Sequence, residues 1–305
     1  MKIKVSAPGK LMLLGEHAVV YGHPCIVTAV DKRLYVEAEV IDSDEDEIIA
    51  PQVKESRFVL ETITLFKQKY QIKKRVKIRT KGDFSHNVGL GSSSAVTVAT
   101  FKALSEIFNK KLSLRQIFEL SYEVTLKIQG VGSGFDIAAA TFGGVLYFTK
   151  GGKVIESLEI KSLPLVVGYS GVKADTPLIV RNLKLKMQNE KLKVKIEKNF
   201  VLINKLVKSA KKALVNKNWK ELGGLMTEDH ELLIRLGVST EKLNIMVKAA
   251  LVTGAYGAKL SGAGGGDCMI ALVSEDKRRN VETAIKKVGG EIIKINNNAE
   301  GVRID

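Results

Sequence analysis

Hydrophobic and polar residues alternate in short runs along the first half of the chain. The stretches IKVSA, CIVTAV, RLYVEAEV and RVKIRTK have the period-two or β-branched character that is typical of strands. Helical spacing predicts helices over residues 56–70 and 93–108, and a capping-box pattern at Ser113 and Gln116 starts a third. Gly151 and Gly152 separate two further strand-like runs and predict a hairpin turn.

The second half begins with a buried strand and then becomes mainly helical. Residues 163–171 read as the strand, and three or four helices are expected between residues 176 and 236. Ser239 or Thr240 caps a later helix, and Ser274 caps another. Strands occur in clusters with helices between them, without a regular βαβ rhythm. The pattern therefore predicts an α+β chain of two domains, 1–160 and 161–305.

Composition places the chain among ordinary globular enzymes. It has 305 residues, of which 45% are hydrophobic and 27% charged. No apolar run of about 18 residues predicts a transmembrane helix, and the polar N-terminus does not resemble a signal peptide. Cys25 and Cys268 are the only cysteines, so we expect neither a disulfide framework nor a cysteine metal site, and a cytoplasmic location.

The strongly basic balance leaves more than one interpretation open. A formal charge of +15 fits nucleic-acid binding, a positive field that gathers anionic substrates, or a lysine-rich solvated surface. Much of the excess lies in residues 181–220, where apolar residues keep helical spacing: Leu192, Ile196, Ile203, Leu206, Ala210 and Leu214. The lysines are therefore expected on the solvated face of a packed helix. Aromatic residues for base stacking are sparse there, so no nucleic-acid partner is expected.

The stretch NVGLGSSSAV combines glycines, hydroxyl side chains and the start of a predicted helix. Glycines allow the backbone to approach an anion closely, and the free N–H groups at a helix start attract negative charge. Serine hydroxyls add donors and are potential Mg²⁺ ligands. The sequence from Gly89 to Ser94 is neither a Walker A loop nor a complete Rossmann fingerprint. Alone it is equally compatible with a tight turn capped by serine.

Two further glycine-rich segments carry candidate chemistry. Asp136 stands where the turn GSG becomes the alanine-rich stretch FDIAAA, either as a simple first-turn charge or as a group that orients or deprotonates a hydroxyl. The segment 261–268, SGAGGGDC, has more glycine than a hairpin needs, which suggests a backbone that passes close to a ligand. Together the three segments favour phosphoryl transfer, which needs mainly positioning and charge neutralisation.

The three segments also occur in the order found in the GHMP kinases, the family named for galactokinase, homoserine kinase, mevalonate kinase and phosphomevalonate kinase. APGKLMLLGEHAVVYG resembles the first family motif, GLGSSSA the phosphate loop and KLSGAGGGDC the third motif, so the resemblance covers essentially the whole chain. It implies a two-lobed α+β fold, with a ribosomal-S5-like N-terminal domain that binds ATP and a ferredoxin-like C-terminal domain.

The resemblance also implies roles for individual residues. Asp136 is the expected base or hydroxyl-orienting group, and Lys10 is expected beside the transferred phosphoryl group. Ser93 is the expected Mg²⁺ ligand. The expected residues of the acceptor pocket are Glu16, His17, Tyr21 and Ala263. The expected ATP-binding residues are Gly89, Leu90, Gly91, Ser92, Ser93, Ser94, Gly264 and Gly265.

The chain departs from the family pattern at one metal-binding position. Members that act on mevalonate usually have a glutamate eleven residues before the catalytic aspartate, as a second Mg²⁺ ligand. Here that position is Thr125, and Glu123 is two residues away. A shift of two residues points to another side of a helix, so Glu123 is not a direct substitute. The Mg²⁺ ion is then expected to keep additional water ligands.

The expected substrate follows from two stretches within the family resemblance. GEHAVVYG and HELLIRLGVST are similar to the members that phosphorylate mevalonate, whereas the surroundings of Asp136 and Asp267 are similar to those that act on 5-phosphomevalonate. We expect ATP- and Mg²⁺-dependent phosphorylation of the 5-hydroxyl of mevalonate, in isoprenoid biosynthesis. The alternatives are 5-phosphomevalonate as acceptor, or a basic nucleic-acid-binding protein on a kinase-like fold. The sequence does not reveal the oligomeric state, and a homodimer stays open.

Overall fold

The structure, a computed structural model, describes residues 2–53, 55–85 and 87–305. Its strands are β1 (Lys2–Leu14), β2 (Pro24–Ile41), β3 (Glu47–Ile49), β4 (Arg75–Gly82), β5 (Val145–Thr149), β6 (Ile155–Leu158), β7 (Leu165–Tyr169), β8 (Gly257–Ser261), β9 (Cys268–Leu272), β10 (Glu291–Ile293) and β11 (Arg303–Ile304). The α-helices are α1 (Arg57–Tyr70), α2 (Ser92–Ile107), α3 (Leu114–Gln129), α4 (Phe135–Phe142), α5 (Thr176–Lys186), α6 (Glu190–Val215), α7 (Trp219–Leu236), α8 (Glu241–Val252) and α9 (Glu275–Lys287). Two short 3-10 segments are η1 (Ala18–Tyr21) and η2 (Lys150–Gly152).

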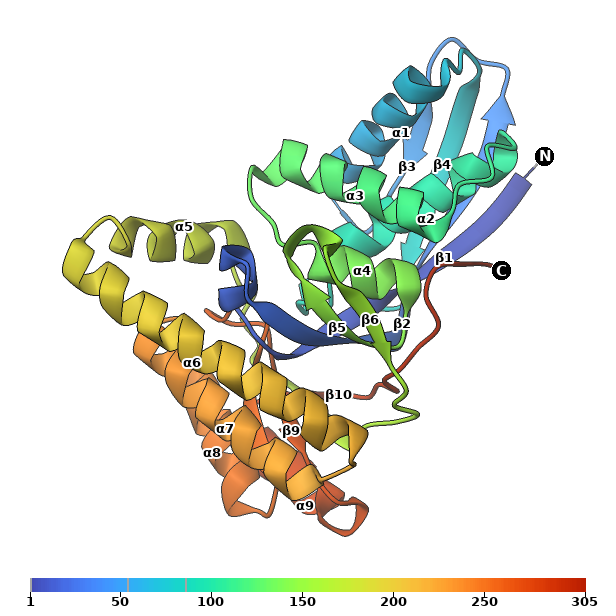
Figure 1. Cartoon of the computed structure of the whole chain (residues 1–305). Coiled ribbons are helices and arrows are strands. Elements are labelled where there is room, and N and C mark those ends of the chain that lie inside the picture. The colour runs from blue at the N-terminus through green and yellow to red at the C-terminus, as the bar shows by residue number, and fades with distance from the viewer. Residues whose placement is uncertain (1, 54, 86) are drawn as a thin grey trace.

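The first sheet is built around the long strand β2, which pairs with β1, β4 and β5. Its main path runs β11-β1-β2-β4-β3, and the β5–β6 hairpin extends it from β2. Helices α1 to α4 lie together beside this sheet (Figure 1). A core of apolar residues from both layers, including Val36, Phe66, Val98 and Phe118, is almost completely buried. Burial of this shared apolar face holds the helices to the sheet.

The second sheet has the order β10-β7-β9-β8 and is antiparallel throughout. Helices α7 and α8 contact β8, and α9 contacts β7 and β10. In Figure 1 these strands and the helices α6 to α9 form the lower lobe. Two sheets, each with its own helices, confirm the predicted two-lobed α+β architecture.

The two lobes are joined by more than the single crossing near residue 160. Ser261, at the end of β8, exchanges two hydrogen bonds with the backbone of Met12 on β1, each 3.0 Å long. The C-terminal strand β11 returns to pair with β1, so the two chain ends lie side by side (Figure 1). The buried Arg33 holds this return by donating to the carbonyl oxygens of Glu300, at 2.8 Å, and Gly301, at 2.7 Å. The domain ranges divided near residue 160 stay a prediction.

Local sequence signals placed most element ends correctly. Helix α1 begins directly after Ser56, and α2 begins one residue before the expected start at Ser93. The capping box of α3 is complete, because both reciprocal hydrogen bonds between Ser113 and Gln116 are present. Thr240, not Ser239, caps α8 through its side chain.

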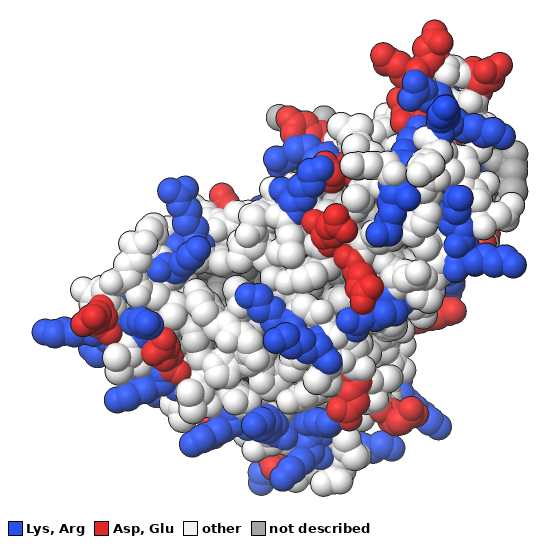
Figure 2. Space-filling view, turned by 45° about the horizontal axis from the view of Figure 1, so that its top comes forward, with Lys and Arg blue, Asp and Glu red and all other residues white. Residues whose placement is uncertain are grey.

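The lysine-rich segment forms α5 and α6, as the helical spacing predicted. Of the six apolar residues predicted to pack, Ile196, Ile203, Ala210 and Leu214 are buried and Leu206 is partly buried. Leu192, in the first turn of α6, is 42% exposed, so the prediction was wrong there. Most lysines of α6 are exposed, as expected. On the face shown in Figure 2, basic side chains form separate groups with acidic and uncharged surface between them. Within the described ranges, no helix combines the length and apolar character needed to cross a membrane.

Helix α7 approaches β8 through a glycine, and this contact makes a testable pair of substitutions. A Cβ atom on Gly223 would lie 2.3 Å from the backbone of Tyr256, whereas one on the neighbouring Gly224 would meet nothing within 4 Å. We expect Gly223→Ala to destabilise the protein by roughly 2–4 kcal/mol, because helix and strand must separate. Gly224→Ala should stabilise it by about 0.5–1 kcal/mol, because alanine favours the helix. Urea denaturation of both variants measures the difference; equal effects would contradict this packing.

Candidate active site

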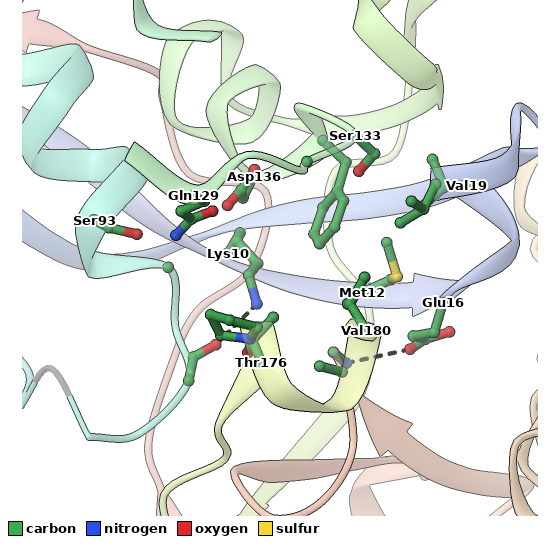
Figure 3. A pocket seen from close by; sticks show the side chains of 18 of the residues that line it. Lys10, Met12, Glu16, Val19, Ser93, Gln129, Ser133, Asp136, Thr176 and Val180 are labelled. Carbon is green, nitrogen blue, oxygen red and sulfur yellow. Dashed lines mark hydrogen bonds between the residues drawn. The ribbon is translucent and has the colours of Figure 1, made fainter. Parts of the chain in front are cut away.

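A cavity of about 200 Å³ opens where the two lobes meet. Its walls come from β1 and the turn after it, the loop before α2, the end of α3, the start of α4, the start of α5 and the loop after β8. Residues from these elements that line it include Lys10, Glu16, His17, Gly89, Gly91, Ser92, Ser93, Thr125, Gln129, Asp136, Lys173, Thr176, Val180, Ala263 and Asp267. Segments far apart in the sequence therefore meet in one site (Figure 3).

The loop from Gly89 to Ser94 lies directly on β1. Gly89 and Gly91 have left-handed backbone conformations, with φ of 74° and 79°. A Cβ atom on Gly91 would lie 3.1 Å from the side chain of Lys10, so glycine permits the close approach. Helix α2 starts at Ser92, and its first N–H groups have no partners within the helix. The loop thus has the features of an anion-binding helix start.

Lys10 stands in the centre of the cavity, between this loop and the other walls (Figure 3). Its backbone N–H donates to the carbonyl of Leu90 at 2.9 Å, and its ammonium group donates to the carbonyl of Gly89 at 2.8 Å. The side chain is 7% exposed, and its Nζ lies 5.7 Å from the ring centre of Phe135. The charge is therefore held at a fixed point beside the glycine loop.

Asp136 occupies the first turn of α4, with its carboxylate fixed by two donors. The hydroxyl of Ser94 donates to Oδ2 at 2.6 Å, and the backbone N–H of Ile137 donates to Oδ1 at 3.0 Å. Gly134 precedes the helix with φ of 90°, which turns the chain into the cavity. In Figure 3 the side chains of Asp136, Ser93 and Gln129 lie on the same side of Lys10.

Glu16 and His17 form the opposite wall, close to the third glycine-rich segment. The Nε2–H of His17 donates to the carbonyl of Ala263 at 2.8 Å, and burial lowers the pKa of this histidine, so the ring is neutral at pH 7. The Glu16 carboxylate accepts a hydrogen bond of 3.4 Å from the N–H of Gly262 and forms a salt bridge with Lys259. His17, Glu16 and Ala263, which were predicted in the acceptor pocket, all line this cavity.

The glycines after Ala263 face the protein rather than the cavity. A Cβ atom on Gly264 would lie 2.0 Å from the carbonyl oxygen of Val238, and the N–H of Gly265 donates to that oxygen at 2.8 Å. These glycines let the third segment fit closely against the end of α7. Their predicted part in ATP binding is not visible in the lining of the cavity.

Three other predicted residues also lie outside the cavity lining. Tyr21 is 37% exposed and stacks on Phe200 of α6, with ring centres 4.8 Å apart. Leu90 is buried in the core, and Ser94 reaches the site through its bond to Asp136. Of the predicted acceptor residues, the structure therefore brings Glu16, His17 and Ala263 together but not Tyr21.

Sequence reasoning missed the contribution of the segment before and within α5. Lys173, Thr176 and Val180 line the cavity, but no motif marks them. Asp267 also lines it, and its carboxylate accepts from the N–H of Ala174 at 3.0 Å, which joins the glycine-rich segment to this part of the chain. The positive φ of Asp267, 56°, follows from the same tight loop. Its position directly after three glycines was the available signal.

The candidate oxygen ligands for a metal ion beside the phosphate loop are hydroxyl groups. Ser93 and Thr125 both line it, and the hydroxyl of Thr125 is buried without a hydrogen-bond partner. Glu123 is exposed on α3 and does not line the cavity. In the part of the chain that the structure describes, no group of three His, Cys, Asp or Glu side chains is arranged to hold a metal. The site therefore fits a Mg²⁺ ion held largely by phosphate and water, and not a protein-enclosed metal.

Comparison with known families identifies both lobes. Residues 57–144 match the family model described as GHMP kinases N terminal domain, and residues 210–291 match the one described as GHMP kinases C terminal. The first match contains the glycine loop and Asp136. The second contains α7, β8 and the third glycine-rich segment.

Full-length relatives and a solved structure agree with these matches. The mevalonate kinase of Pyrococcus abyssi is 37% identical over 99% of this chain and 98% of its own. The mevalonate kinase of Thermococcus sibiricus is 36% identical over 100% of this chain and 99% of its own. The crystal structure of L. major mevalonate kinase in complex with R-mevalonate matches with a TM-score of 0.84 and 25% identity, over 98% of this chain and 96% of that one. With both family domains matched and relatives similar along its whole length, this chain belongs to the GHMP kinase family.

Proposed function

We propose that this protein is a small-molecule kinase that transfers the γ-phosphoryl group of ATP to the 5-hydroxyl of mevalonate. The observation that carries the proposal is the convergence of Lys10, Asp136 and the glycine loop in one cavity. The full-length similarity to mevalonate kinases supports this acceptor. Kinases of this kind need an anion cradle, a fixed cation and one oriented carboxylate, and all three are present.

The chemistry follows from how these groups are fixed. Asp136 accepts or orients the proton of the acceptor hydroxyl, because Ser94 and the N–H of Ile137 hold its carboxylate toward the cavity. Lys10 stabilises the negative charge of the transferred phosphoryl group. The N–H groups at the start of α2 and the adjoining loop hold the other phosphates. Each group is positioned before substrate binds, so little reorganisation is needed.

The acceptor is assigned to the side of the cavity formed by Glu16, His17 and Ala263. Neutral His17 and the carboxylate of Glu16 offer hydrogen-bonding partners for hydroxyl groups of the acceptor. Mevalonate also carries a carboxylate, which needs a basic partner. Among the residues that the structure describes, Lys10 and Lys173 are the lysines that line the cavity. Since Lys10 is assigned to the phosphoryl group, we assign Lys173 to the acceptor carboxylate.

We assign Mg²⁺ to the part of the cavity where the hydroxyl groups of Ser93 and Thr125 lie beside the phosphate loop. Ser93 would hold it, and the unpartnered hydroxyl of Thr125 offers a second oxygen, directly or through water. When bound, the ion neutralises charge on the ATP phosphates. The absence of a carboxylate at position 125 predicts weaker metal binding than a glutamate there would give.

The acceptor is tested by measuring ADP release with mevalonate, 5-phosphomevalonate, galactose and homoserine. We expect turnover with mevalonate to exceed that with each alternative by roughly 100-fold or more in kcat/KM, because the hydrogen-bonding groups of the pocket would otherwise be left unpaired. A preference for 5-phosphomevalonate would instead make the protein a kinase that acts on 5-phosphomevalonate. No turnover with any acceptor, together with salt-dependent retention on nucleic acid, would overturn the enzyme assignment.

The role of Asp136 is tested with Asp136→Asn. The amide still accepts from Ser94 but cannot take a proton, so we expect kcat to fall by about 10²–10⁴-fold while ATP binding stays nearly unchanged. Glu123→Gln removes a carboxylate from exposed α3 and serves as the control. Steady-state kinetics and equilibrium ATP binding distinguish the two effects. Near-normal turnover by Asp136→Asn would refute its role.

The metal assignment is tested with Ser93→Ala. Loss of one oxygen ligand should raise the Mg²⁺ concentration needed for half-maximal turnover by roughly 10-fold, and ATP affinity without Mg²⁺ should change little. Titration of activity and of nucleotide binding with Mg²⁺ measures both quantities. An unchanged Mg²⁺ requirement would exclude Ser93 as a ligand.

A further inference from the structure

A buried cluster of charged side chains lies directly behind the acceptor wall. Glu16, which follows β1, is 1% exposed, although it lines the cavity. Lys259 of β8 and Asp229 of α7 are both 0% exposed. The Lys259 ammonium group forms a salt bridge with Oε1 of Glu16, lies 3.4 Å from Oδ2 of Asp229, and donates to the carbonyl of Leu260 at 2.6 Å. Three elements from both lobes are thus joined at one lysine.

The charges of this cluster do not balance if all three groups are ionised. Two carboxylates then face one ammonium group, and a net negative charge is shut away from water. Such a buried charge is costly, and the usual outcome is that one group changes its protonation state. Burial, and then the charge of Glu16, raise the pKa of Asp229 to about 8, although Lys259 opposes the shift. One proton held by the two carboxylates makes the cluster neutral.

The hydrogen-bond pattern indicates where that proton lies. Both carboxyl oxygens of Asp229 and the Oε2 atom of Glu16 are buried without a hydrogen bond, although Oδ2 of Asp229 lies 3.4 Å from the Lys259 ammonium group. Because Lys259 contacts both carboxyl groups, they lie close to each other. Two acceptors can satisfy each other only if one of them is protonated. The Lys259 ammonium group lies farther from Asp229 than from Glu16, so the proton belongs to Asp229.

We propose that Asp229 is a positioning residue for the acceptor: its protonated carboxyl group donates a hydrogen bond to Glu16 and, with Lys259, fixes the Glu16 side chain in the wall of the cavity. This inference rests on the proposed function, because it takes that wall as the acceptor side. Asp229 itself does not line the cavity and acts only through Glu16. The O–H group of protonated Asp229 donates to Oε2 of Glu16, which otherwise has no hydrogen bond.

Other titratable groups around the cluster are neutral near pH 7. Burial lowers the pKa of His17, and burial together with Lys259 lowers the pKa of His230 to about 4. Burial raises the pKa of the Cys25 thiol, and the nearby negative charge of Glu16 raises it further. Among the described residues, Glu16 and Lys259 are the charged groups that act on the Asp229 carboxyl group. Its ionisation is the change expected in this cluster between pH 7 and pH 9.

The test compares Asp229→Asn with Asp229→Leu. An asparagine amide donates to Glu16 at every pH, whereas leucine fills a similar volume without a donor and leaves Glu16 and Lys259 as a neutral pair. We expect Asp229→Leu to raise the KM for mevalonate by roughly 10-fold at pH 7, with the KM for ATP within about 2-fold. Asp229→Asn should keep the KM for mevalonate within about 3-fold of the unchanged protein. Glu228→Gln, on the exposed side of the same helix, is the matched control and should change neither KM.

The pH dependence of the KM for mevalonate distinguishes a positioning role of Asp229 from a purely structural one. In the unchanged protein, the KM for mevalonate should rise above about pH 8 as Asp229 ionises beside Glu16. With Asp229→Asn the KM should stay flat to pH 9. A wild-type KM in Asp229→Leu, or an equal loss in both variants, would overturn the proposal.

Unfolding measurements keep this inference separate from the identity of the acceptor. The unfolded chain loses the Asp229 proton near its ordinary pKa of 3.8, whereas the native protein keeps it to about pH 8. Between these values the unfolded state binds fewer protons, so the stability of the unchanged protein relative to Asp229→Asn should fall as pH rises. An infrared carbonyl band of a protonated carboxyl group should be present at pH 7 and absent in Asp229→Asn. If both signals appear but mevalonate is not phosphorylated, the proposed function fails and the carboxyl pair stands; if neither appears, the pair is refuted.

Discussion

The close contact between the glycine loop and β1 at Lys10 is the constraint on which the site depends. Lys10 is bonded to this loop twice, through its backbone to Leu90 and through its side chain to Gly89. A Cβ atom on Gly91 would lie 3.1 Å from the Lys10 side chain, so a larger residue there would press on it. The contact fixes the start of α2, and therefore the proposed phosphate site, relative to the first strand of the sheet. A cation and an anion cradle are thereby held together before any ligand arrives.

Asp136 and the acceptor wall are attached to this centre by different means. Asp136 is held by Ser94, which belongs to the same loop, so the proposed base and the proposed phosphate site are held together. The acceptor wall instead spans the lobes, because Glu16 is bound to Lys259 and Gly262, and His17 to Ala263. If the proposed sites are right, a change in how the lobes meet would alter acceptor binding more than phosphate binding.

Residues with local signals could be predicted from the sequence, and residues placed by tertiary packing could not. Lys10, Ser93 and Asp136 stand in glycine-containing motifs whose local conformation aims them at the cavity, and the structure brings all three to it. Lys173 and Val180 reach the site only because α5 is packed over it. Tyr21 belongs to a motif, yet stacking on Phe200 of α6 draws it away, which nothing near it in the sequence indicates. Helix and strand ends were predictable where caps exist, as at Ser113, but the return of β11 to β1 is a long-range pairing without a local signal.

The central claim is that one cavity brings the acceptor hydroxyl between Asp136 and the phosphate loop. A crystal structure of the protein with mevalonate, Mg²⁺ and an unreactive ATP analogue tests it most directly. We expect the 5-hydroxyl oxygen to lie about 2.6–3.2 Å from the Asp136 carboxylate, with the terminal phosphate against the Gly89–Ser94 backbone and Lys10. Mevalonate or the nucleotide bound at another surface, with Asp136 facing neither, would contradict it.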